Sequence, residues 1–250
     1  MNKQIILLFL IISIMVSCKK KDPCDDLVNG VYQFPALPKN HTMTSQQVTE
    51  FWDLPQDICG CITTEGLVET CLNYPDLRLI FAGSSPQSGY DLLVKDRFGG
   101  IRELEGRLDR GRCLLNKFQT LDPLGYDPNW EPVEIGRFTF NIYYVEIIFS
   151  QYVNLKLLTN DEKILLIETA TVMYDKMKSD IEIYSLWGLE CTTTLSGRLM
   201  LQDSYEPFVK TYNENELVWE LLTYYGPTSW ETVELVNNLS KEYLTYLKNN

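Results

Sequence analysis

Apolar residues recur three and four positions apart along most of the chain, with charged and polar residues between them. The spacing is clearest in three segments, at residues 64–72, 162–178 and 229–247. It places the apolar side chains on one face of a helix, which is the face that packs against a core. The pattern therefore predicts amphipathic helices over all three segments.

A similar stripe lies between residues 101 and 118. Its apolar members are Ile101, Leu104, Leu108, Leu115 and Phe118. Glu103 and Arg107 lie four positions apart, the separation at which helical side chains of opposite charge meet. We expect a helix across this segment, with an ion pair between Glu103 and Arg107 on its surface.

Five short motifs resemble helix starts, in which a short polar side chain and an acid or amide three residues later bind free backbone N–H groups. They are Thr44-x-x-Gln47, Ser88-x-x-Asp91, Thr159-x-x-Glu162, Asn213-x-x-Glu216 and Thr228-x-x-Glu231. Pro227 stands before the last motif and predicts the end of the preceding helix, because the residue before a proline disfavours helical backbone.

The segment 138–152 fits two kinds of element. Its density of Phe, Ile, Tyr and Val favours a strand. Its apolar residues nevertheless step by three or four positions from Phe138 to Leu155, and strict alternation fails at Tyr143-Tyr-Val145. We predict a buried helix here on the strength of the period, with a strand as the alternative.

These elements together predict an all-α fold, an irregular array of about eight antiparallel helices joined by mostly short loops. No fixed period relates one helix to another, so helical hairpins are expected and a solenoid-like stack is the alternative. We divide the chain into a lipoprotein signal peptide (1–17), a lipid anchor, tether and N-terminal loop (18–43), and a single helical domain (44–250).

The first eighteen residues have the organisation of an export signal. Lys3 precedes an apolar run from Ile5 to Val16, and Cys18 follows the small residue Ser17. The run is too short to cross a bilayer as a helix, which takes roughly 20 residues. An aliphatic residue and small residues before a cysteine form a lipobox, so we predict that palmitate or similar chains on Cys18 anchor the protein. An ordinary secretory signal cut near Ser17 is the alternative.

The residue after Cys18 bears on localisation. An aspartate at this place retains lipoproteins of Gram-negative bacteria at the inner membrane, whereas this chain has Lys19. We therefore expect the protein to be lipid-anchored at the outer membrane, on its periplasmic or its surface-exposed face.

Charge limits the class of partner. The net charge is −12, and it becomes −13 once the signal peptide, which holds one lysine and no acid, is removed. A surface this acidic repels the phosphates of nucleic acid, so we expect no nucleic-acid partner. Hydrophobic residues make up 45% of the chain, which is enough for a sizeable core.

Six cysteines follow the predicted anchor: Cys24, Cys59, Cys61, Cys71, Cys113 and Cys191. An even number in an exported protein predicts disulfides, and six cysteines allow fifteen full pairings. We expect at least one bridge, with Cys59 or Cys61 as the first choice of member. A metal site on Cys59, Cys61 and Cys71 is disfavoured, because structural zinc sites space paired cysteines more widely and the only histidine, His41, lies in a loop.

The connection Leu121–Gly136 is the longest stretch without a helical pattern, and long loops often carry function. We select it as the candidate ligand-binding loop, with the residues Tyr126, Asp127, Asn129, Trp130 and Glu131. Trp130 and Tyr126 could stack on a sugar or a peptide, while burial of Trp130 in the core is the alternative. The acids have the alternating spacing of a calcium loop, but two prolines and a missing glycine contradict that motif.

No catalytic motif is recognisable in the chain: there is no G-x-S-x-G elbow, H-E-x-x-H, P-loop or G-x-G-x-x-G. Carboxylate chemistry needs only two acids, and Glu65 and Glu69 lie one helical turn apart. A solvated helix face is the simpler interpretation of that pair. We accordingly expect no catalytic residue, no metal and no cofactor.

Several short motifs in residues 50–120 carry a resemblance. They are Trp52-x-Leu54-Pro55, Thr63-Thr-Glu-Gly-Leu67-Val-Glu-Thr-Cys71-Leu-Asn-Tyr74-Pro75, Gly89-Tyr90 and Phe98-Gly-Gly-Ile-Arg-Glu103-Leu104. On these residues the chain resembles uncharacterised secreted or lipid-anchored helical proteins of Bacteroidota-type bacteria. The resemblance implies a helical exported domain and carries no activity.

Three functions are compatible with these observations. The absence of catalytic motifs favours a cell-envelope lipoprotein that binds a glycan, a peptide or a partner protein, and that is held to the membrane by its N-terminal lipid. A hydrolase of envelope or dietary polymer with paired carboxylates is the first alternative. An inhibitor or immunity-type protein that uses its acidic surface is the second.

Overall fold

The structure is a computed structural model that describes residues 22–226 and 228–250. It is 70% helix and 2% strand, with thirteen α-helices in the described part of the chain, which confirms the predicted all-α class. The signal peptide, Cys18 and Lys19 lie outside the described residues.

The α-helices, in chain order, are α2 (Ser45–Phe51), α3 (Gln56–Cys59), α4 (Thr64–Leu72), α5 (Pro86–Gly89), α6 (Gly99–Gly106), α7 (Arg110–Gln119), α8 (Pro132–Phe149), α9 (Tyr152–Leu155), α10 (Asn160–Ser179), α11 (Ile181–Gln202), α12 (Glu206–Glu214), α13 (Glu216–Tyr224) and α14 (Trp230–Asn249). Shorter elements are η1 (Pro23–Asp26), η2 (Leu77–Ala82), η3 (Tyr90–Lys95) and the strands β1 (Leu27–Val28) and β2 (Val31–Tyr32).

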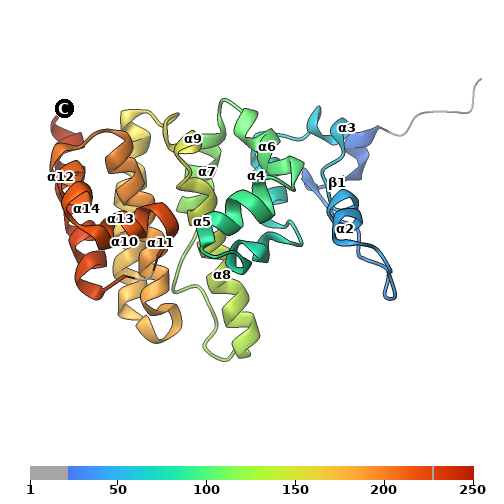
Figure 1. Cartoon of the computed structure of the whole chain (residues 1–250). Coiled ribbons are helices and arrows are strands. Elements are labelled where there is room, and N and C mark those ends of the chain that lie inside the picture. The colour runs from blue at the N-terminus through green and yellow to red at the C-terminus, as the bar shows by residue number, and fades with distance from the viewer. Residues whose placement is uncertain (1–21, 227) are drawn as a thin grey trace, which may run out of the picture.

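The molecule is elongated, and the chain runs along its long axis (Figure 1). The N-terminal elements α2 and α3 lie at one end, and α12 and α14 lie at the other. Between α8 and the C-terminus, α10 packs against α11 and α14, while α11 also packs against α8. Consecutive helices such as α10 and α11 are thus paired along the array.

The helix α11 lies at the centre of the C-terminal half. It contacts α8, α10, α12, α13 and α14, and every residue from Gly188 to Met200 is buried. Its buried hydroxyl groups are hydrogen-bonded: Thr193 and Ser196 donate to carbonyls one turn earlier, and Thr194 donates to the carbonyl of Leu221 in α13. One continuous apolar cluster extends from Trp52 in the N-terminal half to Leu247 in α14.

Several predicted helices are confirmed by the structure. The helix over 64–72 has the predicted bounds. The helix α10 begins two residues earlier and ends one later than predicted, and α14 begins one residue later and ends two later. The doubtful segment 138–152 is largely helical, because α8 covers residues 132–149. Pro132 at its first turn and the Glu131–Glu134 capping box fix where α8 begins.

The prediction of one helix through 101–118 was wrong. The chain leaves helical geometry at Arg107, whose backbone is extended, and starts again as α7 at Arg110. Gly106 weakens the end of α6, and Asp109 is held by a 2.8 Å hydrogen bond from the Thr64 hydroxyl. Leu108, expected in the core, is 87% exposed at this break. The predicted Glu103–Arg107 ion pair is present at 2.9 Å.

Two of the five predicted helix starts are capping boxes, at Thr44 and Thr159. The other three predictions misplaced the cap, which is Ser85, Asn215 or Ser229. At the last of these starts, the backbone N–H of Thr228 is bound by Glu190. The residue that caps α14 is Ser229, whose hydroxyl accepts a hydrogen bond from the N–H of Thr232.

A small β-hairpin occupies part of the region predicted as N-terminal loop. Val28 pairs with Val31 around a turn in which Asn29 and Gly30 both have positive φ, the geometry that an Asn-Gly turn favours. The carbonyl of Gly30 lies against Gly66 of α4, where an added Cβ would come within 2.1 Å of the oxygen. Only glycine at position 66 allows the hairpin to dock so closely.

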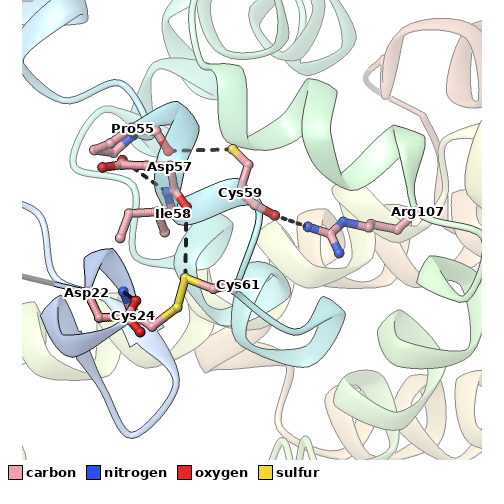
Figure 2. The surroundings of a disulfide bond; sticks show 8 residues. All are labelled: Asp22, Cys24, Pro55, Asp57, Ile58, Cys59, Cys61 and Arg107. Atoms are coloured by element: carbon pink, nitrogen blue, oxygen red, sulfur yellow. Dashed lines mark hydrogen bonds between the residues drawn. A yellow bond between two sulfur atoms is a disulfide. The ribbon is translucent and has the colours of Figure 1, made fainter. Parts of the chain in front are cut away.

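A disulfide joins Cys24 to Cys61, with a Cα–Cα distance of 5.9 Å (Figure 2). It attaches the N-terminal segment to the connection between α3 and α4, and it confirms both the predicted bridge and the choice of Cys61 as a member. Cys59, Cys71, Cys113 and Cys191 are free thiols. The carbonyl of Cys59 accepts a 2.6 Å hydrogen bond from Arg107, which ties this connection to the end of α6 (Figure 2).

Candidate functional site

The predicted ligand-binding loop is shorter than expected, since α8 begins at Pro132 and leaves only residues 120–131 as connection. Two of its polar side chains form hydrogen bonds with backbone N–H groups of the loop and of the helix that follows. Asp127 accepts a 2.8 Å hydrogen bond from the backbone N–H of Asn129, and Glu131 caps α8. Tyr126 donates a hydrogen bond to Asp180. Within the described residues, no group of three or more His, Cys, Asp or Glu side chains is placed to hold a metal ion.

Trp130 of this loop is partly exposed and packs against the start of α8. It is 37% exposed, and its ring meets that of Phe138 edge-on with 5.9 Å between the centroids. The ligand-binding role predicted for this loop stays a prediction.

The acids Glu65 and Glu69 do line one small pocket, of about 320 Å³. Each of them has a partner there, because Glu69 pairs with Lys117 at 2.7 Å and Glu65 accepts from the Cys113 thiol at 3.5 Å. Such engaged carboxylates fit a structural role better than a catalytic one.

Two larger pockets lie in the middle of the molecule. The first, here called the Arg137 pocket, has a volume of about 660 Å³. It is formed by the end of α4, by η2 and by the first half of α8. Its polar and aromatic lining includes Asn73, Arg78, Arg137, Phe140, Asn141 and Tyr144. Val133 and Gly136, from the second half of the predicted loop, also line it.

The second, here called the Glu190 pocket, has a volume of about 640 Å³. It is formed by α5, α11 and the end of α13 with the connection that follows it. The residues that matter for its chemistry are Ser85, Trp187, Glu190, Glu220, Tyr224 and Thr228.

Two residues in unusual backbone conformations shape the Glu190 pocket. Ser185 has φ 53° inside α11 and interrupts the helix there, and its hydroxyl accepts from the N–H of Trp187 as a new helix start. Tyr225 ends α13 in the left-handed conformation, with φ 54°. Strain of this kind is found preferentially at ligand sites, and here it directs Trp187 and the end of α13 to one pocket.

Glu190 lies at the base of its pocket and is only 4% exposed. One carboxylate oxygen accepts a 3.0 Å hydrogen bond from the backbone N–H of Thr228. Burial raises the pKa of Glu190 to about 7, and this hydrogen bond opposes the rise. The hydroxyl of Thr228 is itself buried and has no hydrogen-bond partner in the described part of the chain.

Phe81 of η2 connects the two pockets. Its ring contacts Phe140 and Tyr144 of the Arg137 pocket at centroid distances of 5.0 and 5.7 Å. It also meets the ring of Trp187 of the Glu190 pocket, at a centroid distance of 5.8 Å. The four rings, here called the aromatic bridge, join two pockets that differ in charge.

The charges of the two pockets are opposite. Arg78 and Arg137 line the first, whose described lining residues include no acid; Asp76, beside the pocket, lies 3.8 Å from Arg78, so Arg137 is the main positive group. Glu190 and Glu220 line the second, whose described residues include no base. A ligand that spans the aromatic bridge would therefore meet positive charge at one end and negative charge at the other.

Sequence reasoning did not find this site. Phe81, Phe140 and Trp187 come from three separate elements, and none stands in a recognisable motif. One signal was present: Glu190 is the only acid between Leu186 and Leu201, in a segment otherwise rich in apolar and small polar residues. A lone acid in a buried helix is typical of a functional or a tightly bound position.

Within the described ranges, none of the helices combines the length and the apolar character that a membrane crossing needs. The chain matches no protein-family model, no curated protein and no solved structure.

Proposed function

We propose that the protein is a lipid-anchored binding module of the bacterial outer membrane, which holds a peptide segment of a partner protein across the aromatic bridge. The single observation that carries this proposal is the pair of oppositely charged pockets joined by Phe81. The anchor is supported by the lipobox that ends at Cys18, and the outer membrane by Lys19.

A peptide suits the site better than a neutral glycan. Aromatic rings can stack on either ligand, but the two pockets also offer opposite charges at their ends. Peptides carry acidic and basic side chains separated by apolar ones, and this order complements the surface. The amides of Asn73 and Asn141 in the Arg137 pocket could bind the peptide backbone.

A second function is favoured by one observation, namely that Glu190 and Glu220 line the same pocket. Two carboxylates in one cleft are the catalytic pair of most glycosidases. In such a hydrolase Glu190, with its raised pKa, would donate the proton. Release of reducing sugar from envelope polysaccharides, with loss of that activity in Glu190→Gln, would favour hydrolysis over binding.

The anchor can be tested by replacing Cys18. Cys18→Ala should move the protein out of the membrane fraction or block its processing, because burial of acyl chains supplies the attachment. Fractionation with immunoblotting, and labelling with an alkynyl palmitate, measure both effects. Cys59→Ala is the matched control, since it removes a cysteine outside the lipobox. A correctly processed Cys18→Ala protein that still pellets with membranes would contradict the anchor.

Peptide binding can be tested by phage display against the immobilised full-length protein. We expect the selected peptides to place an acidic and a basic residue on either side of apolar ones. Arg137→Glu and Trp187→Ala should each weaken their binding at least tenfold, as measured by fluorescence anisotropy. Trp230→Ala is the control, because Trp230 is an exposed tryptophan, at 39%, that lines neither pocket.

Neutral oligosaccharides serve as competitors in the same assay. If a neutral oligosaccharide binds alone and loses affinity in the same two variants, the ligand is a glycan and the peptide proposal is wrong. The variant Trp130→Ala, measured beside them, reports whether the predicted loop belongs to the binding surface.

A further inference from the structure

Glu190 is a buried acid without a positive partner. Within the described residues, the one hydrogen bond to its carboxylate comes from the N–H of Thr228, and that carboxylate takes part in no ion pair. A carboxylate removed from water is costly unless a cation or several hydrogen bonds compensate its charge. Burial raises the pKa of Glu190 to about 7, because no cation within the described residues compensates the charge of its carboxylate.

The walls of the pocket suit a cation. The rings of Trp187 and Tyr224 line it, and aromatic faces attract ammonium and guanidinium groups. A second acid, the half-buried Glu220, adds negative charge, and none of the described lining residues is basic. Tyr224 is 45% exposed, so the pocket can be entered from solvent.

An organic cation fits better than a metal ion. Hard metal ions take six or more oxygen ligands, and no such group of side chains is found in the described part of the chain. The volume of about 640 Å³ has room for a long side chain and exceeds what a bare ion fills. Ser85 and Thr228 also line the pocket and add polar character to its wall.

We propose that the Glu190 pocket holds the ammonium or guanidinium group of a lysine or arginine side chain in the bound peptide. Glu190 forms the ion pair, Glu220 adds to the field, and Trp187 and Tyr224 contact the cation and its apolar stem. The inference rests on the proposed function, because it assigns one end of the peptide to one pocket.

The probes are N-acetyl-lysine amide and N-acetyl-arginine amide, with N-acetyl-norleucine amide as the uncharged analogue of the same length. Their binding to the full-length protein is followed by NMR of the tryptophan indole N–H signals, with Trp187 assigned from Trp187→Phe. We expect the charged probes to shift the Trp187 signal and to bind at least tenfold more tightly than the norleucine probe. Equal binding of the three probes would overturn the proposal.

Glu190→Gln keeps the size of the side chain and an acceptor for the N–H of Thr228, so the fold should persist. It should weaken binding of both charged probes at least tenfold, and Glu220→Gln should weaken it less. Glu216→Gln, on the exposed start of α13, is the matched control and should have no effect. Unchanged affinity in Glu190→Gln would overturn the proposal, and the comparison with norleucine decides the question if that variant does not fold.

The two proposals fail in different ways. Small cations that bind through Glu190, in a protein that selects no peptide dependent on Arg137, would support the cation pocket and remove the proposed function. Selected peptides that require Arg137 but contain no basic residue and are indifferent to Glu190→Gln would do the reverse.

Discussion

Glu146→Gln should raise the free energy of unfolding at pH 8 and reduce its dependence on pH between 5 and 8. Glu146 lies on α8, is 0% exposed, and accepts a 2.6 Å hydrogen bond from Thr192 at one carboxylate oxygen. Its other oxygen is buried without a partner among the described residues. Burial raises the pKa of Glu146 to about 8, and the hydrogen bond from Thr192 opposes the rise.

The direction of the effect follows from proton linkage. In the unfolded chain this carboxyl loses its proton near pH 4.5, whereas in the folded protein it keeps the proton up to about pH 8. Between these values the folded state binds more protons, so stability falls as the pH rises. Each unit of displacement corresponds to about 1.4 kcal/mol, which gives an upper bound of roughly 4 kcal/mol at pH 8. Glutamine does not titrate and removes this dependence.

Urea unfolding of both proteins at pH 5, 6, 7 and 8 measures the effect. Some dependence on pH should remain in Glu146→Gln, because the pKa of Glu190 is raised in the same direction. Glu242→Gln, on the exposed side of α14, is the control and should leave the curve unchanged. Parallel curves for the wild type and Glu146→Gln would show that the buried carboxyl does not titrate in this range.

Loss of the Cys24–Cys61 disulfide should be the second large change. Cys61→Ser should lower the free energy of unfolding by about 2–4 kcal/mol, because the bridge closes a loop between residues 37 positions apart and restricts the unfolded chain. The same loss is expected when the wild type is reduced with dithiothreitol. Alkylation of the denatured, unreduced protein should label Cys59, Cys71, Cys113 and Cys191 and leave the bridged pair unlabelled.

Cys59→Ser is the matched control for this prediction. Cys59 is a free, half-buried cysteine two positions before Cys61, so its replacement tests the loss of a thiol without the loss of a bridge. Labelling of all six cysteines, or equal stability of the reduced and oxidised proteins, would contradict the disulfide.

The sequence predicts this fold best where one signal acts alone over several turns. The helix 64–72 and the helix α10 have a continuous period, α10 also has the predicted start at Thr159, and the structure confirms both helices. In α8 the spacing of apolar residues correctly predicted a helix although the residue types favour a strand, because the segment is a helix buried on several sides. The stripe through 101–118 failed since the period continues across Gly106, while the tertiary contact of Asp109 with Thr64 breaks the helix. The hairpin was missed because each of its strands has only two residues.

The candidate site was harder to predict for a physical reason. Composition favoured the loop before α8, but there Asp127 and Glu131 bind backbone N–H groups and Asp122 pairs with Lys176. The aromatic bridge instead depends on four rings that tertiary packing brings together from η2, α8 and α11, and no local sequence pattern predicts this contact. Glu190 could have been selected from the sequence as the lone acid of a buried helix. The other residues of its pocket lie largely on other elements, so the pocket itself could not.

The position of the disulfide also determines how the protein responds to a pulling force. Tension applied at the N-terminus passes from Cys24 through the sulfur bond to Cys61, so the interval between them carries no load. Fully extended, these 37 positions span about 130 Å of contour length. While the bond is intact, that length stays hidden even if the hairpin and α2 unfold. Reduction would release it, so the redox state of one bond sets how far the helical array can be drawn from whatever holds its N-terminus.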